Sequence, residues 1–118
     1  ITPVSYNFMK LYETGVIVGA GTDVPLDKGC GSPVSKELAL MVSCGLDPLS
    51  AIRVGTGNGA AILDLDNVCG TIREGLEADL LIVDGDPSID IEALQKVRAV
   101  YVGGELAYSP DQTVPVKF

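Results

Sequence analysis

The sequence predicts an α/β fold built as one small domain, and three observations carry this prediction. The chain has 118 residues, of which 47% are hydrophobic, which is enough for a core and too many for a disordered chain. Its first half combines helical apolar patterns with one short apolar run, and its second half holds short β elements. The short apolar run has the pattern of a buried strand, and a buried strand needs neighbouring strands on both edges. The first half therefore looks like a piece of a larger barrel or sheet.

The N-terminal elements are predicted to be a helix and a buried strand. Apolar spacing over residues 5–13 favours a helix with one apolar face, which Gly15 ends. The run Val-Ile-Val-Gly-Ala at residues 16–20 has the pattern of a strand buried on both faces. Residues 21–23, Gly-Thr-Asp, follow it and place a carboxylate, Asp23, directly after the strand.

Two helices are predicted next. Ser32 and Pro33 provide a cap and a first helical residue, and Gly45 ends this helix. Its apolar stripe consists of Leu38, Met41 and Val42. The second helix begins at Asp47-Pro48 and continues to residue 63. Its predicted face contains Leu49, Ile52, Thr56, Ala60 and Leu63.

The second of these helices contains Gly55, Gly57 and Gly59. A glycine inside a helix costs about 0.8–1.0 kcal/mol relative to alanine. The stretch is therefore either broken or packed very closely against a neighbouring backbone, and the sequence leaves both outcomes open.

The second half of the chain is predicted to form short strands separated by turns. The expected strands are residues 70–75, 78–84, 97–102 and 105–108. Gly103-Gly104 between the last two is a strong signal for a two-residue hairpin. A helical turn is expected over residues 90–96, and the tail after Ser109 is irregular.

Composition excludes several classes of function. Lys and Arg total 8 against 16 Asp and Glu, and no basic run exists, so binding to nucleic acid or to anionic lipid is not expected. The apolar runs are far too short to span a membrane, and no secretory leader is visible. The three cysteines, Cys30, Cys44 and Cys69, form no CxxC pair and are interpreted as reduced thiols of a cytoplasmic protein.

The chain has no histidine, which removes the commonest general base and the commonest transition-metal ligand. It does contain an ordered series of short motifs. In chain order these are Gly15-Val16, Gly21-Thr22-Asp23, Glu37-Leu38, Met41-Val42, Gly45-Leu46-x-Pro48, Ala51-Ile52-Arg53, Thr56-x-Asn58-x-Ala60, Gly70-Thr71-Ile72-x-x-Gly75, Ala78-Asp79-Leu80 and Asp84-Gly85-Asp86-Pro87. Their order and spacing resemble the amidohydrolase superfamily, most closely its imidazolonepropionase and prolidase-like branch.

This resemblance implies that the chain is the C-terminal fragment of a metal-dependent (β/α)₈ barrel with a small β-sandwich domain. Residues 1–66 would be the last barrel strand and the helices after it. Residues 67–109 would contribute the C-terminal strands of the sandwich, and residues 110–118 an irregular tail.

The resemblance also implies a role for Asp23, because barrel active sites are assembled at the ends of strands. In the family this carboxylate ligates a divalent metal, usually zinc, and takes a proton from the water that attacks a C–N bond. It then passes that proton to the leaving nitrogen. Catalytic zinc needs about three protein ligands, so the resemblance implies partner ligands outside this chain. Alone, the chain is expected to hold no metal and to be inactive.

Other interpretations remain open at this stage. Asp23 could simply cap a turn, and Asp79, Asp84 and Asp86 are explained by turn chemistry. Gly55-x-Gly57-x-x-Ala60 fits a dinucleotide-binding fingerprint, which demands a strand before it and a helix beginning inside it. A non-catalytic interaction or structural module is a third class.

The substrate and the metal count are also open. Cyclic amides, dipeptides and other small amide-type molecules all suit the resemblance. An isolated barrel strand would expose two unpaired edges. We therefore expect a homo-oligomer in which residues 16–20 or 70–108 pair between chains.

Overall fold

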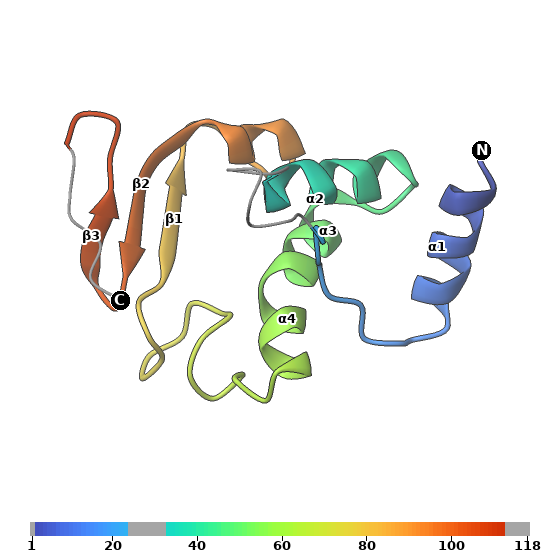
Figure 1. Ribbon diagram of the computed structural model, residues 1–118, viewed down its shortest axis with the longest axis horizontal. Coiled ribbons are helices and arrows are strands. Elements are labelled where there is room, and N and C mark those ends of the chain that lie inside the picture. The colour runs from blue at the N-terminus through green and yellow to red at the C-terminus, as the bar shows by residue number, and fades with distance from the viewer. Residues whose placement is uncertain (1, 24–32, 113–118) are drawn as a thin grey trace.

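The computed structural model describes residues 2–23 and 33–112 and contains helices followed by a three-stranded sheet (Figure 1). The elements in chain order are α1 (Pro3–Glu13), α2 (Val34–Ser43), α3 (Pro48–Gly55), α4 (Gly57–Ile62), β1 (Leu80–Val83), η2 (Ile91–Gln95), β2 (Val97–Val102) and β3 (Glu105–Tyr108). The α/β class predicted from the sequence is confirmed. The sheet and α1 lie at opposite ends of the molecule (Figure 1).

Local sequence signals account for the ends of the helices. Thr2 caps α1 by accepting a 3.1 Å hydrogen bond from the Ser5 N–H, and Asp47 caps α3 by accepting one of 3.0 Å from the Ser50 N–H. The helix α2 ends at Ser43, and Gly45 follows the C-cap residue Cys44 with a φ of +116°, a left-handed conformation that glycine tolerates best. Pro33 is the N-cap of α2, and the predicted cap residue Ser32 lies outside the described residues.

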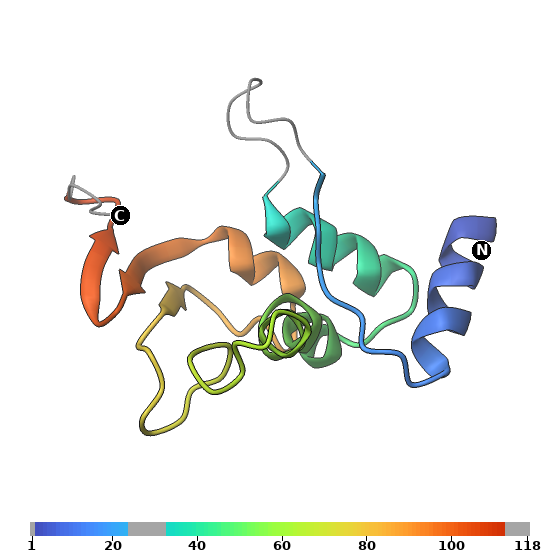
Figure 2. The ribbon, with the colours of Figure 1, turned by 60° about the horizontal axis from the view of Figure 1, so that its bottom comes forward.

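The hydrophobic core lies where α2, α3 and η2 meet (Figure 2). It consists of Leu38, Met41, Leu46, Ala51, Val54 and Ile91. Ile91 enters from the short 3-10 helix η2, so a segment of the second half of the chain completes the core of the first half. Partly buried side chains of α1, among them Phe8 and Tyr12, pack against this cluster.

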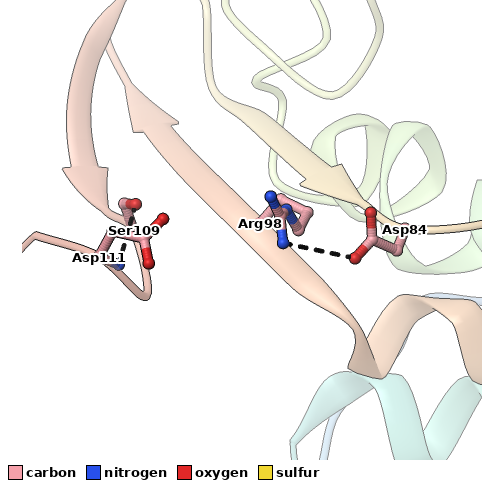
Figure 3. A network of polar contacts seen from close by, with 4 residues as sticks. All are labelled: Asp84, Arg98, Ser109 and Asp111. Carbon is pink, nitrogen blue, oxygen red and sulfur yellow. Dashed lines mark hydrogen bonds and ion pairs between the residues drawn. The ribbon is translucent and has the colours of Figure 1, made fainter.

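The sheet is antiparallel in the order β1-β2-β3. Gly103 and Gly104 join β2 to β3 with φ values of +58° and +82°, which is the two-residue hairpin expected from the sequence. An exposed ion pair links the edge strand to its neighbour, with 3.8 Å between Arg98 Nη1 and Asp84 Oδ2 (Figure 3). Such exposed pairs contribute about 0–1 kcal/mol, so backbone pairing is the main support of the sheet.

The long helix predicted after Asp47 is interrupted. At Thr56 the backbone leaves the helical region, with φ −130° and ψ −91°, and separates α3 from α4. Close packing occurs as well: a Cβ on Gly55 would lie 2.8 Å from Leu38 Cδ1, and one on Gly70 would lie 2.5 Å from Ala60 Cβ. The stretch is therefore broken, and Gly55 packs closely against a side chain rather than against a neighbouring backbone. The predicted face was partly wrong, since Leu63 is exposed whereas Val54 is fully buried.

Two strand predictions were wrong. Residues 16–20 form no strand, and Val16 and Ile17 are 52% and 59% exposed rather than buried. Residues 70–75 form bends and a turn, with Ile72 91% exposed. A strand exists only where a second backbone pairs with it. Within the described ranges neither segment has such a partner, although residues 16–20 are apolar and residues 70–75 contain the β-branched pair Thr71-Ile72.

Candidate functional site

An irregular segment of residues 16–23 follows α1 (Figure 2). Asp23 is the last residue of this segment that the structure describes. Its side chain is exposed, and its backbone has a φ of +50°. A residue with a side chain pays about 1–2 kcal/mol for this left-handed conformation, although Asp and Asn tolerate it better than most. The conformation is uncommon for a residue other than glycine.

Asp64 is the other non-glycine residue with a positive φ in the described parts of the chain, at +57°. Its conformation has a local explanation, because it follows the end of α4. The Leu65 N–H donates to the Ala60 carbonyl at 2.8 Å and the Asp64 N–H to the Ala61 carbonyl at 3.2 Å, which is a Schellman motif. Asp23 ends no helix, so helix capping does not explain its backbone.

The segment before Asp23 is held by side chains from two helices that come later in the chain. Asn58 Nδ2 of α4 donates to the Val18 carbonyl at 3.0 Å. The Gly21 N–H donates to Glu37 Oε1 of α2 at 3.3 Å. Gly19 packs so closely on α4 that a Cβ there would lie 2.9 Å from Ile62 Cδ1. These contacts fix residues 18–21 without any strand pairing.

Glu37 is the functional candidate that sequence reasoning missed. Nothing local in the sequence reveals its contact with a residue 16 positions earlier. Its Oε2 is buried and has no hydrogen-bond partner among the described residues. The carboxylate borders an open groove of about 740 Å³. The groove is lined by Gly21, Thr22, Lys36, Glu37, Ala39, Leu40, Ser43, Glu92 and Gln95.

Asp86 has the turn role predicted for it, whereas Asp79 supports a hairpin 24 positions later in the chain. Asp79 Oδ1 accepts the Gly103 N–H at 2.8 Å, and Asp86 Oδ1 accepts the Ser88 N–H at 2.9 Å. The Ser88 hydroxyl, followed by the Ser88 N–H, lowers the pKa of Asp86 by hydrogen bonding to its charged form. Cys44 is half-buried against Ser5, and Cys30 lies outside the described residues.

The dinucleotide-binding interpretation lacks its structural context. The helix α3 runs into Gly55, where the fingerprint requires a strand, and α4 has only 6 residues. The glycines here serve helix packing instead. No helix within the described ranges is long and apolar enough to cross a membrane.

Residues 2–23 and 33–112 contain no group of three or more His, Cys, Asp or Glu side chains that could hold a metal ion. The exposed Asp23 carboxylate suits one ligand position of a metal, and no more than that, because a catalytic zinc site takes about three protein ligands.

A model of the amidohydrolase family matches residues 1–107 of the chain. The chain belongs to the amidohydrolase family. This confirms the resemblance inferred from the motifs between Gly15 and Pro87. Family membership extends over the helices and the sheet alike.

Individual relatives agree with this assignment. Ochratoxinase of Aspergillus niger is 31% identical over 107 residues, covering 86% of this chain and 22% of its own length. Imidazolonepropionase of Treponema denticola is 32% identical over 93 residues, which cover 76% of this chain and 22% of the relative's own length. A crystal structure of a Xaa-Pro dipeptidase superposes with a TM-score of 0.78 at 35% identity, covering 90% of this chain and 25% of its own. The chain thus spans about a quarter or less of the proteins it matches.

Proposed function

We propose that this chain is the C-terminal part of a metal-dependent hydrolase that cleaves C–N bonds in small molecules, with Asp23 in its active site. The observation that carries the proposal is the position of Asp23. It lies within the family match of residues 1–107, at the end of a segment that Asn58 and Glu37 hold in place. Its left-handed backbone has no helix-capping explanation, and such strain concentrates at functional sites.

The proposed division of the chain follows the same reasoning. Residues 1–66 would complete a (β/α)₈ barrel as its last strand and following helices. Residues 16–20 would become a strand once neighbouring strands pair with both edges, which agrees with their apolar composition. Residues 67–109 would join a small β-sandwich, and residues 110–118 would be its irregular tail. The exposed Ile72 supports this, because it would find cover there.

Asp23 would act as one metal ligand and as a proton carrier. A divalent metal, with zinc as the proposed ion, would polarise the substrate and lower the pKa of water in the site. The Asp23 carboxylate would accept a proton from the attacking water and return it to the leaving nitrogen as the C–N bond breaks. The remaining ligands would come from parts of the longer protein outside residues 1–118.

The proposed substrate is a small amide-type molecule, such as a cyclic amide or a dipeptide. The names of the relatives support this class, since they include a Xaa-Pro dipeptidase, an ochratoxinase and an imidazolonepropionase. We also propose that the protein is cytoplasmic, in keeping with the free thiols of Cys44 and Cys69 among the described residues, and forms a homo-oligomer.

The test uses the complete protein, meaning the product of the full reading frame that contains residues 1–118. We expect that reading frame to encode a His-x-His pair upstream of Ile1. In the expressed protein, Asp23→Asn should reduce kcat on its best amide substrate by about 10²–10⁴-fold, the usual range for a group that transfers protons. Asp66→Asn is the matched control, because Asp66 is an exposed turn residue.

Two results would contradict the proposal. One is a reading frame without upstream histidines. The other is an Asp23→Asn protein whose kcat and metal content equal those of the Asp66→Asn protein.

A further inference from the structure

The hydrogen bond between Glu37 and Gly21 reaches the backbone only two residues before Asp23. The Gly21 N–H donates to Glu37 Oε1 at 3.3 Å, across 16 positions of sequence. Asn58 holds Val18, farther from Asp23, by a separate bond of 3.0 Å. Among the described residues, Glu37 is therefore the side chain whose hydrogen bond to the segment lies nearest to Asp23.

The surroundings of Glu37 suit a residue that orients a backbone. Its second oxygen, Oε2, is buried without a hydrogen-bond partner in the described parts of the chain, although buried polar atoms are usually paired. A partly buried carboxylate that holds a single N–H contributes little packing. It does provide a side-chain oxygen that accepts the Gly21 N–H, and a Gln side chain would offer the same acceptor.

The helix α2 gives Glu37 a fixed origin. Leu38, the next residue, is 4% exposed and belongs to the core cluster, and Gly55 of α3 packs against it. Core packing thus fixes the backbone of Glu37. Its carboxylate, through the hydrogen bond to the Gly21 N–H, in turn holds Gly21 in place. Asp23 follows with a φ of +50°, a conformation that needs such support.

We propose that Glu37 is a positioning residue: by holding the Gly21 N–H it sets the backbone at Asp23 and so aims the Asp23 carboxylate at the metal. This inference rests on the proposed function. Partners that orient a metal ligand are often worth 10–100-fold in metal affinity. Glu37 would contribute in this way without touching substrate or metal.

The experiment measures two properties of the complete protein: zinc affinity, by competition with a chelator, and hydrogen exchange at the Gly21 amide. Glu37→Ala should weaken zinc binding about tenfold, equivalent to about 1.4 kcal/mol, and speed Gly21 exchange by at least about tenfold. Glu37→Gln keeps an Oε1 acceptor and should stay within about threefold of wild type on both measures. Glu92→Ala is the matched control, because Glu92 lies on η2 across the same groove.

Glu37→Asp keeps the proposal testable if Glu37→Ala fails to fold. It retains the charge but is shorter by one methylene, so it should lose the hydrogen bond from the Gly21 N–H and behave like the alanine variant. The proposal is overturned if Glu37→Asp and Glu37→Ala bind zinc as wild type does, or if Glu92→Ala weakens zinc binding equally. It is also overturned if the Glu37→Gln protein binds zinc as weakly as the Glu37→Ala protein. An Asp23→Asn protein that binds zinc normally would instead refute the proposed function, so the two failures are distinguishable.

Discussion

The helical half and the sheet differ in how far each is packed. In the helical half, Leu38, Ala51 and Val54 are buried and share a core with Ile91. In the sheet, no residue of β1, β2 or β3 is buried. Leu81 and Ile82, adjacent residues of β1, are 49% and 45% exposed. Because adjacent residues of a strand point to opposite faces, both faces of β1 are open.

This difference shows that the two regions are stabilised by different forces. Burial of apolar area holds α2, α3 and η2 together, whereas backbone pairing and a glycine hairpin define the sheet. Substitutions that remove buried methyl groups should therefore affect the helical half much more than the sheet. Three predictions follow, in order of decreasing effect.

Leu38→Ala and Leu81→Ala give the largest contrast. Leu38 is 4% exposed, so its truncation should lower the free energy of unfolding by about 2–5 kcal/mol through lost burial and a residual cavity. Leu81 is half-exposed, and its truncation should cost less than about 1 kcal/mol. Urea unfolding of both variants measures the difference. Equal costs would mean that the sheet is as well packed as the helices, contrary to the comparison.

Gly70→Ala and Gly59→Ala test the close packing on α4. A Cβ on Gly70 would lie 2.5 Å from Ala60 Cβ, at a backbone φ of +99°. Overpacking and left-handed strain should together cost about 2–4 kcal/mol. Gly59 is helical, and nothing lies within 4 Å of a Cβ there, so alanine should stabilise by about 0.5–1 kcal/mol. The midpoint temperature of thermal unfolding should fall for Gly70→Ala and rise for Gly59→Ala. A change in the same direction for both variants would contradict the close packing of Gly70 on α4.

The smallest expected effect is on stability in acid, and it involves one hydrogen-bonded carboxylate in each region: Asp47 at the start of α3 and Asp86 in the turn after β1. Hydrogen bonds from the Ser50 hydroxyl and the Ser50 N–H lower the pKa of Asp47, and Ser88 does the same for Asp86. A carboxyl whose pKa is lower in the folded state stabilises the fold above its unfolded pKa. That contribution is lost as the pH falls through the folded pKa.

Asp47→Asn retains an acceptor for the Ser50 N–H but cannot titrate. Its stability should therefore fall less steeply than that of wild type as the pH drops below about 4. Denaturant unfolding at a series of pH values measures this slope, with Asp86→Asn as the equivalent change beside the sheet. If stability falls with pH as steeply in both variants as in wild type, neither carboxylate contributes to acid sensitivity.

The sequence predicted most local elements because their signals are local. Asp47-Pro48 and Gly103-Gly104 specify a helix start and a turn within a few residues, and both are found. The Thr2 cap was not predicted, and α1 begins at Pro3 rather than at residue 5. The failures at residues 16–20 and 70–75 have one physical cause. Composition indicates that a segment can form a strand, but a strand needs a second backbone, which the described residues do not provide.

The candidate site was only partly predictable for a related reason. Asp23 was predicted as a site residue through an ordered set of motifs that extends over most of the chain. Glu37 was missed because its relation to Gly21 depends on how α2 is placed by Leu38 in the core. Long-range contacts of this kind leave no pattern in one sequence.

The central claim is that Asp23 is one ligand of a metal centre that other parts of a longer protein complete. Metal analysis after dialysis, carried out on the 118-residue chain and on the complete protein, tests it most directly. We expect less than about 0.1 zinc per isolated chain and about one or more per complete protein, because catalytic zinc takes about three protein ligands. A tightly held zinc in the isolated chain, or none in the complete protein, would contradict the account.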